Sequence, residues 1–285
     1  MLTGVKDNMP AAYALWSIRI GFAANIMPRA FGILCWASLW SACLASTLFG
    51  QAIKYSGHGN SVLVDQFKNT TAFWEQFEVA KKIVMLHDTS VLYELEAHLS
   101  DRDRHARGNA AFVFAALGDD RGFEVIKAVL NDRSDRPEGQ GIGACCWSLR
   151  GQIAADRSYA AHLFGDLKDS RAVPILVPLL KDKEVNWVVP WSLGEIGDKS
   201  AIPPLIETLG DDSPDMRVLA ICALEKLNAK EALPRLSVLL NDDARIHFDG
   251  LGSVATAARV AIANLSGQPY SCRLAGKGEC ACDPR

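Results

Sequence analysis

The chain has 285 residues, of which 49% are hydrophobic and 22% are charged. This length and composition exclude a disordered or collagen-like polymer and allow a sizeable core in one domain or in an array. The net charge of -3, from 30 Lys and Arg against 33 Asp and Glu, gives no electrostatic reason to expect non-specific nucleic-acid binding.

The first distinctive segment is a run of 24 uncharged residues, Ala30–Ile53, with a basic residue before it and small residues near its end. This layout is typical of a secretory signal cleaved after Ala52. We therefore expect residues 1–26 to be a non-native or extended N-terminus and residues 27–52 to be a signal peptide. The run is also long enough for an uncleaved membrane anchor, and Cys43 offers a lipoprotein site. All three alternatives predict that the rest of the chain is secreted, periplasmic or membrane-anchored outside the cytoplasm.

Residues 53–72 are expected to cap a repeat array that occupies residues 73–265. One segment type recurs in the array: an apolar helix, a short turn with Gly or Asp, a second helix and an Asn/Asp-rich turn. The clearest copies are LGDDRGFEVIKAVLND from Leu117, LKDSRAVPILVPLLKD from Leu167, IGDKSAIPPLIETLGD from Ile196 and LNAKEALPRLSVLLND from Leu227. A lone helical hairpin cannot bury its apolar face, so these hairpins must stack.

The partner helices align on a leucine near the end of each, at Leu86, Leu117, Leu149, Leu193, Leu224 and Leu265. Three of the successive spacings are 31 or 32 residues, and the two longer ones indicate insertions. We place these insertions at Asn131–Gly141, followed by an extra short helix over Arg157–Asp166, and at Asn241–Ser253.

Prolines and aspartates mark the helix boundaries. A proline recurs in the opening turn of the first helices, where a missing N–H costs nothing, at positions 174, 203 and 234. An aspartate recurs in the turn between paired helices, where it can cap an N-terminus, at positions 182, 212 and 242. Pro190 falls inside the apparent helix EVNWVVPWSLGEI and is expected to kink it.

The stretch LGEIGDKSAIPPL, Leu193–Leu205, resembles the short bacterial HEAT-like repeats that are often named after phycobilin-lyase subunits. Arg171-Ala172-Val173-Pro174 repeats its second half, and the resemblance covers about Phe73–Leu265. It implies an all-α, right-handed superhelix of about five or six helical hairpins. Such repeats serve many roles, so the resemblance is specific for the fold and says little about function.

Tryptophans are the candidate partner-binding residues. Trp147 and Trp191 fall at equivalent positions of the second helices in our alignment, and Trp187 lies one turn before Trp191 on the same face. In HEAT-like arrays the second helices line the concave surface, so the resemblance implies that these rings stand in a groove and anchor a partner. The alternative is that the rings fill the core between repeats.

No pattern typical of catalysis or metal binding is found in the sequence. The six histidines show neither H-x-x-H nor H-E-x-x-H spacing, and the His-Glu pairs that mark iron-binding hydroxylases built on such repeats are missing. There is no G-x-S-x-G, and Gly139–Gly143 lacks the G-x-G-x-x-G spacing. We therefore predict no catalytic residue, no metal site, no cofactor and no enzymatic activity.

The tail, residues 266–285, abandons the repeat pattern for Gly, Pro and Cys. In an exported protein, Cys272 can close a small loop with Cys280 or Cys282, and the remaining thiol can pair with Cys145 or Cys146. The spacing does not decide the connectivity. Cys222 lies in an apolar helix and is expected to be a buried thiol.

These observations predict an exported, non-catalytic binding or scaffold protein that holds a protein partner of unknown identity on its concave face. No nucleic-acid partner is expected, and a membrane is contacted only through an uncleaved signal or a lipid anchor. The alternative from the resemblance is an accessory factor or lyase for a prosthetic group, which export disfavours because the phycobilin-lyase relatives work in the cytoplasm. A purely structural oligomer is a third hypothesis.

Overall fold

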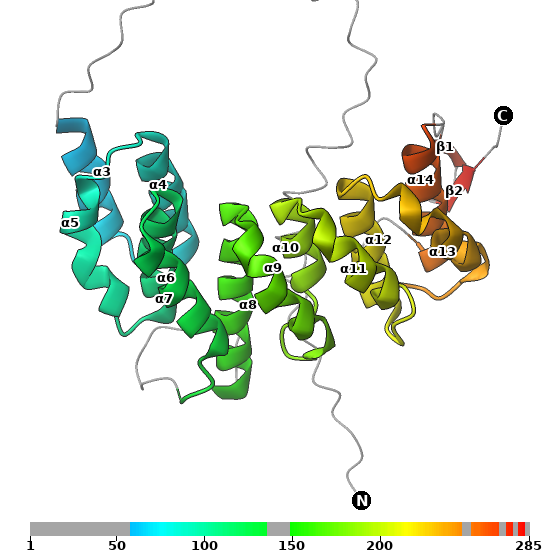
Figure 1. The fold of residues 1–285 in the computed structure, drawn as a ribbon, viewed down its shortest axis with the longest axis horizontal. Coiled ribbons are helices and arrows are strands. Elements are labelled where there is room, and N and C mark those ends of the chain that lie inside the picture. Colours follow the sequence, from blue (N-terminus) through cyan, green and yellow to red (C-terminus); the bar gives the residue numbers. More distant parts are fainter. Residues whose placement is uncertain (1–57, 136–148, 247–251, 268–271, 276–278, 283–285) are drawn as a thin grey trace, which may run out of the picture.

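The computed structural model describes residues 58–135, 149–246, 252–267, 272–275 and 279–282 (Figure 1). The expected signal at residues 27–52 lies outside the described residues, as do Trp147, Cys145 and Cys146. Export and cleavage therefore stay predictions from the sequence. Within the described ranges, no helix combines the length and the apolar character that crossing a bilayer requires.

The described residues form helix pairs that follow one another along a curved array, from α3 at one end to α14 at the other (Figure 1). The first three pairs have these bounds: α3 (His58–Asn69) with α4 (Phe73–Met85), α5 (Val91–Leu95) and η2 (Glu96–Ser100) with α6 (Arg104–Ala116), and α7 (Asp120–Asn131) with α8 (Leu149–Leu167). Helix α3 lies within residues 53–72 and contacts α4, and the role of this segment as a cap stays a prediction.

The remaining pairs begin with first helices that are partly 3-10 in character. Their bounds are η3 (Ser170–Ala172), α9 (Val173–Leu176) and η4 (Val177–Lys181) with α10 (Val189–Ile196), then η5 (Lys199–Ala201) and α11 (Ile202–Thr208) with α12 (Pro214–Lys226), and finally η6 (Lys230–Ala232), α13 (Leu233–Val238) and η7 (Leu239–Asn241) with α14 (Val254–Ser266). The recurrent prolines lie in the first turns of α9, α11 and α13, as predicted.

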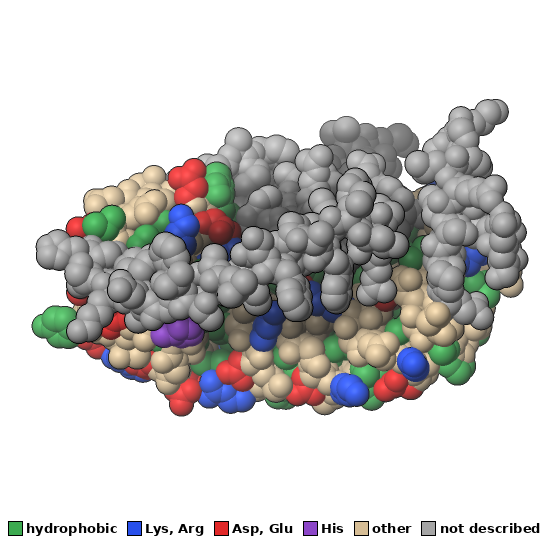
Figure 2. All heavy atoms as spheres, turned by 90° about the horizontal axis from the view of Figure 1, so that it is seen from above, with side chains coloured by type: hydrophobic (Ala, Val, Ile, Leu, Met, Phe, Trp, Pro, Cys, Tyr) green, Lys and Arg blue, Asp and Glu red, His purple; other side chains and the backbone are tan. Residues whose placement is uncertain are grey.

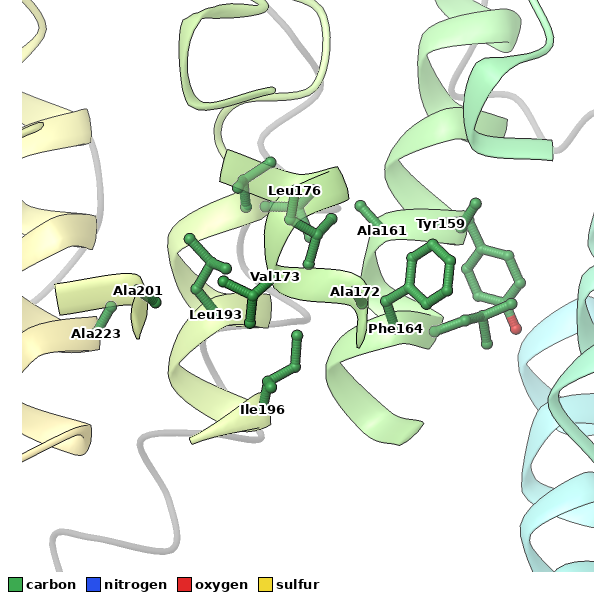
Figure 3. Close-up of a cluster of buried hydrophobic side chains, with 14 of the residues drawn as sticks. Tyr159, Ala161, Phe164, Ala172, Val173, Leu176, Leu193, Ile196, Ala201 and Ala223 are labelled. Carbon is green, nitrogen blue, oxygen red and sulfur yellow. The ribbon is translucent and has the colours of Figure 1, made fainter. Parts of the chain in front are cut away.

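Stacking of the pairs creates one continuous core. Each second helix contacts the next, in the order α4, α6, α8, α10, α12 and α14. Figure 3 shows the packing at α8, α9 and α10, where the buried side chains of Phe164, Val173 and Leu193 point into the space between the helices. These contacts confirm the predicted all-α superhelix, because each apolar face is buried only by the neighbouring pair.

The turns that follow the second helices explain the start of each repeat copy. A residue with positive φ follows each of the first five second helices, and these residues are His87, Gly118, Lys168, Gly197 and Asn228. Four of the five helices that come next are preceded by an aspartate whose side chain accepts a backbone N–H, and these are Asp88, Asp119, Asp169 and Asp198. The repeated Gly/Asn-Asp signature is therefore a helix stop followed by a helix start.

Two predictions about the second helices are wrong. Arg157–Asp166 is no extra short helix but part of α8, which runs 19 residues to Leu167. The helix that was aligned on Leu149 ends at Leu167 instead. Pro190 lies in the first turn of α10, which begins at Val189, so it starts a helix rather than kinking one. A proline in a first turn leaves no intrahelical hydrogen bond unmade, which is why it is accommodated there.

An arginine–aspartate ladder joins consecutive pairs. The Nη2 atom of Arg157 lies 2.7 Å from Asp182 Oδ2, and Arg217 Nε lies 2.9 Å from Asp242 Oδ2, each pair 25 residues apart. Arg107 and Asp132 have the same spacing, with Nη2 and Oδ2 at 3.7 Å. The aspartates also accept backbone N–H groups two residues on, such as that of Glu184 at 3.1 Å.

One predicted helix cap is wrong, and one contact between neighbouring helix pairs lacks the arginine of the ladder. In the α11–α12 pair the capping aspartate is Asp211, which accepts the N–H of Ser213 at 2.8 Å, and not Asp212 as the sequence suggested. The residue 25 positions before Asp211 is Asn186, which cannot supply a guanidinium. The step between the α9–α10 and α11–α12 pairs is thus electrostatically weaker than its neighbours.

An arginine at position 186, opposite Asp211, is expected to stabilise the protein. Asn186→Arg would place a guanidinium opposite Asp211 and raise the free energy of unfolding by about 0.5 kcal/mol, the scale of a partly exposed ion pair. Asn186→Lys is the matched control, because an ammonium lacks the planar fork and should give a smaller gain. Urea unfolding of the three proteins measures the effect, and equal gains for Arg and Lys would contradict the ladder geometry.

The tail forms a short hairpin that the all-α prediction did not include. Strand β1 (Cys272–Ala275) pairs antiparallel with β2 (Glu279–Cys282) beside α14 (Figure 1). The register sets Cys272 opposite Cys282 and Leu274 opposite Cys280. Gly276-Lys277-Gly278 between the two runs is the local signal for this hairpin. Which cysteines form disulfides stays a prediction.

Candidate functional site

Two of the three candidate tryptophans lie in the described part of the chain. Trp191 is on α10, and Trp187 is in the turn before that helix, so the two do not share one continuous helical face as predicted. Both rings are partly buried and pack against the hydrophobic core. Each ring therefore contacts the core and is also partly exposed, so neither the core alternative nor the groove alternative describes it fully. A binding role stays a prediction.

The residue of α8 that corresponds to Trp191 is His162. Trp191 lies five residues before Ile196, where one repeat copy begins, and His162 lies five residues before Leu167, where the preceding copy begins. The predicted equivalence of Trp147 and Trp191 is wrong, because it depended on ending the helix at Leu149. His162 was considered only for metal spacing, although its repeat position was readable once Leu167 was taken as the helix end.

His162 and Trp191 are stacked across the contact between α8 and α10. Their ring centroids are 4.1 Å apart, and the ring planes are inclined by 24°. The approach depends on Gly165, where a Cβ atom would lie 2.8 Å from Cζ3 of Trp191 and 3.0 Å from the Cα of Ser192. Ser192 Oγ also donates to the carbonyl oxygen of Ala161 at 2.9 Å, which fixes the two helices in register.

Asp166 completes this group, which we call the His162 cluster: His162, Asp166 and Trp191. The Nδ1 atom of His162 lies 3.0 Å from Asp166 Oδ2, one helical turn further along α8. The His162 side chain is 11% exposed and the Asp166 side chain 28%, so the cluster reaches the surface at the carboxylate. The ring of His162 therefore lies between the indole face of Trp191 and the carboxylate of Asp166, although the contact between Nδ1 and Oδ2 lacks hydrogen-bond geometry.

The indole nitrogens of Trp187 and Trp191 are notable because neither has a hydrogen-bond acceptor within the described residues, although both atoms are buried. A buried donor without an acceptor costs about 1–3 kcal/mol. Carbonyl or carboxylate oxygens of a ligand or partner would satisfy these donors. The two buried N–H groups therefore make this segment a candidate ligand-binding part of the described array.

A second histidine–carboxylate pair, which joins α6 to α8, is built differently. His105 Nε2 lies 3.6 Å from Asp156 Oδ1, and Asp156 Oδ2 accepts from Arg104 Nη1 at 3.2 Å. The Asp156 side chain is 0% exposed, and the His105 ring stacks on Phe73 at 4.4 Å and meets Tyr159 at 5.0 Å. The charge of Asp156 thus neutralises the buried Arg104 guanidinium, so this pair has a structural role.

The Tyr159 hydroxyl extends this structural network by donating to Asn109 Oδ1. The Asn109 amide in turn donates to the carbonyl oxygen of Phe73 and to Gln76 Oε1, each at 2.9 Å. These bonds tie α4, α6 and α8 together, and their buried atoms are satisfied. The network holds α8 in place and so positions the His162 cluster at its C-terminal end.

Charge, metal-ligand geometry and thiol chemistry narrow the functions open to the described surface. Figure 2 shows acidic and basic side chains interspersed on the visible described face, without an extended basic surface. In the part of the chain that the structure describes, no group of three or more His, Cys, Asp or Glu side chains is arranged to hold a metal ion. Cys222 packs against the core, and burial raises the pKa of its thiol to about 12, so it is a poor nucleophile.

Comparison with known protein families identifies the repeat. A model of HEAT repeats matches residues 148–214 and 182–246, which include α8, α10 and the ladder pairs Arg157–Asp182 and Arg217–Asp242. Residues 148–246 carry HEAT repeats. This confirms the resemblance drawn from LGEIGDKSAIPPL and puts the His162 cluster within the matched HEAT repeats.

A relative of known function is also found. Phycocyanobilin lyase subunit alpha of Picosynechococcus sp. strain PCC 7002 is 31% identical over 153 residues, which are 46% of this chain and 53% of the relative. The chain thus spans about half the length of this curated relative. The match overturns the sequence-based expectation of a protein without enzymatic activity, because the relative is a subunit of an enzyme.

Two solved structures are similar at a coarser level. The complex of CpcE and CpcF of phycocyanin lyase from Nostoc sp. PCC7120 has a TM-score of 0.43 and 24% identity, covering 61% of this chain and 65% of that chain. An engineered protein has a TM-score of 0.38 and 18% identity, covering 73% of this chain and 97% of that chain.

Proposed function

We propose that this HEAT-repeat protein is a subunit of a lyase that acts on a linear tetrapyrrole, with a protein as its partner. The observation that carries the proposal is the 31% identity to phycocyanobilin lyase subunit alpha over 153 residues. It favours the prosthetic-group alternative of the sequence analysis over a non-catalytic scaffold. The extended repeat surface suits a protein partner, either a second subunit or the protein that carries the tetrapyrrole.

The His162 cluster and the neighbouring indoles offer the contacts that such a ligand needs. A linear tetrapyrrole is flat and conjugated, and it carries carboxylate and carbonyl oxygens at its edges. Indole and imidazole faces bind flat rings by offset stacking, worth about 0.5–1.5 kcal/mol per ring beyond area burial. The unsatisfied N–H groups of Trp187 and Trp191 are donors for the edge oxygens.

Binding of phycocyanobilin to the full chain tests this function. We expect saturable quenching of tryptophan fluorescence with a matching change in the absorbance of the tetrapyrrole. Trp191→Leu should weaken binding about 30-fold, because it removes a stacking face and an N–H donor, each worth around 1 kcal/mol.

Trp74→Leu is the matched control for this titration. Trp74 is 49% exposed on α4, outside the His162 cluster, and its replacement should change the dissociation constant less than about twofold. If phycocyanobilin does not bind the wild-type chain, the proposed function is wrong. If both variants weaken binding equally, the ligand lies elsewhere on the array.

A further inference from the structure

We propose that the exposed face of α4 binds a second copy of this chain, with the two α4 helices packed antiparallel about a twofold axis. Helix α4 belongs to the first helix pair, at one end of the described array (Figure 1). The inference is independent of the proposed function, because no residue of the His162 cluster lies on α4.

Exposed hydrophobic side chains gather at this end of the array. Among the described residues five large hydrophobic side chains are exposed, and four of them lie on α3, α4 and α5: Val62, Trp74, Met85 and Tyr93. Helix α4 carries two of these, with Trp74 49% and Met85 75% exposed. The end pairs of a repeat array need polar outer surfaces for solubility, so exposed apolar groups there indicate a contact surface.

The two apolar side chains of α4 lie on one stripe of the helix, with two opposite charges between them. Trp74, Glu78, Lys81 and Met85 are spaced by four, three and four residues, which places them on one helical face. Lys81 Nζ lies 2.5 Å from Glu78 Oε1, and both side chains are exposed. The Trp74 ring packs edge-to-face on Phe73, with the centroids 5.1 Å apart, so it is held in place within one copy.

This stripe is complementary to its own reverse. Its midpoint lies halfway between Glu78 and Lys81, so an antiparallel copy sets Glu78 opposite the copy's Lys81. The same arrangement sets Trp74 opposite the copy's Met85, and a thioether packs well against an aromatic ring. Because the twofold axis repeats each contact, the pairing has two indole–thioether contacts and two carboxylate–ammonium contacts.

A second acid and a second base extend the charge pattern along one side of the stripe. Glu75 and Lys82 are both exposed, and each follows a residue of the stripe by one position. The first half of the face is therefore acidic, through Glu75 and Glu78, and the second half is basic, through Lys81 and Lys82. Parallel pairing of two copies would bring like charges together, whereas antiparallel pairing brings opposite charges together. The charges thus favour a second copy in one orientation.

The area of this face predicts a weak dimer. Helix α4 has 13 residues, which span about 20 Å. One pair of such helices falls below the roughly 1,200 Å² of a stable specific interface. We therefore expect a dissociation constant of about 10 to 100 µM, and assembly that stops at two copies because the twofold contact uses the same face of both.

Analytical ultracentrifugation of the full chain, from about 1 to 300 µM, tests the pairing. The mean mass of the wild type should rise with concentration to twice that of one chain. Glu75→Lys with Glu78→Lys makes the face wholly basic, and Lys81→Glu with Lys82→Glu makes it wholly acidic. Each variant alone should dimerise at least about 30-fold more weakly, because like charges face one another. An equimolar mixture of the two variants should regain a dimer with one copy of each.

Lys199→Glu with Lys230→Glu is the matched control. Both lysines are exposed outside α4, and the net charge changes as much as in Lys81→Glu with Lys82→Glu. This control should dimerise within about twofold of the wild type. Met85→Gln tests the apolar contact without a change of charge and should weaken the dimer about tenfold, since each dimer loses two thioether contacts. It also serves if a charge-reversed variant fails to fold.

Four results would overturn the pairing. They are a wild type that stays monomeric, a mass that grows past two copies, a mixture of folded charge-reversed variants that stays monomeric, and an equal loss of dimer in the control. A monomeric wild type would leave the α4 face to a different protein. The titration with phycocyanobilin is a separate measurement, so failure of the dimer and failure of the proposed function are distinguished.

Discussion

Arg157→Met is expected to lower the free energy of unfolding by about 3 kcal/mol, because it removes a buried guanidinium from two partly buried carboxylates and a backbone carbonyl. Arg157 is 1% exposed and donates from Nη2 to Asp182 at 2.7 Å, from Nη1 to Glu184 at 3.0 Å and from Nε to the carbonyl oxygen of Leu130 at 2.8 Å. The methionine fills much of the volume but satisfies none of these acceptors. Thermal or urea unfolding measures the loss.

Arg133 provides a control within the same cluster. Its guanidinium contacts the same two carboxylates, at 2.7 Å and 2.9 Å, but its side chain is 57% exposed. Arg133→Met should therefore cost less than about 1 kcal/mol, since an exposed ion pair is weakened by solvent and by side-chain entropy. Equal losses for the two variants would show that burial does not decide the strength of this cluster.

The free energy of unfolding lost in Arg157→Met is expected to depend on pH, because Asp182 titrates in this cluster. Burial alone raises the pKa of Asp182, but the hydrogen bonds from Arg157 and from the Glu184 N–H, with the charges of Arg157 and Arg133, lower it below its ordinary value of 3.8. A carboxyl with a depressed pKa contributes stability above its unfolded pKa and loses it as the pH falls through the folded one. The difference between wild type and Arg157→Met should thus narrow below a pH of about 4.

Gly122→Ala is expected to destabilise the protein by about 3 kcal/mol or more, because the added methyl group has no space at the contact between α6 and α7. A Cβ on Gly122 would lie 2.2 Å from the carbonyl oxygen of Ala111 and 2.3 Å from the backbone nitrogen of Ala115. Both atoms belong to the α6 backbone and cannot rotate away as a side chain can. The two helices would have to separate, which exposes core side chains on both.

The expected destabilisation by Gly122→Ala is opposite to the usual preference of helices for alanine over glycine, so the sign of the change tests the close packing. Alanine is favoured over glycine inside a helix by about 1 kcal/mol, so a site free of contacts would gain stability. Ala128→Ser on the exposed face of the same helix is the control, with an expected change within about 0.5 kcal/mol. A Gly122→Ala protein as stable as the wild type would contradict the close approach of α6 and α7.

The repeat architecture followed from local signals in the sequence. The copies that begin at Leu117, Leu167, Ile196 and Leu227 coincide with helix ends because a stop, a cap and an early proline recur in fixed order. The second helices were harder to place. Aligning on Leu149 failed because leucine recurs along every apolar face, and only the 19-residue α8 shows which leucine ends the helix.

The tertiary structure decided what the site contains. His162 and Trp191 are 29 residues apart and on different helices, so their stacking depends on the approach of α8 and α10 at Gly165. The sequence determined the HEAT-like array, its proline-started first helices and the candidacy of Trp187 and Trp191, because these depend on residues within one turn or one hairpin. It did not determine that a histidine and a carboxylate meet an indole, since a pairing across helices is fixed only by how the hairpins pack.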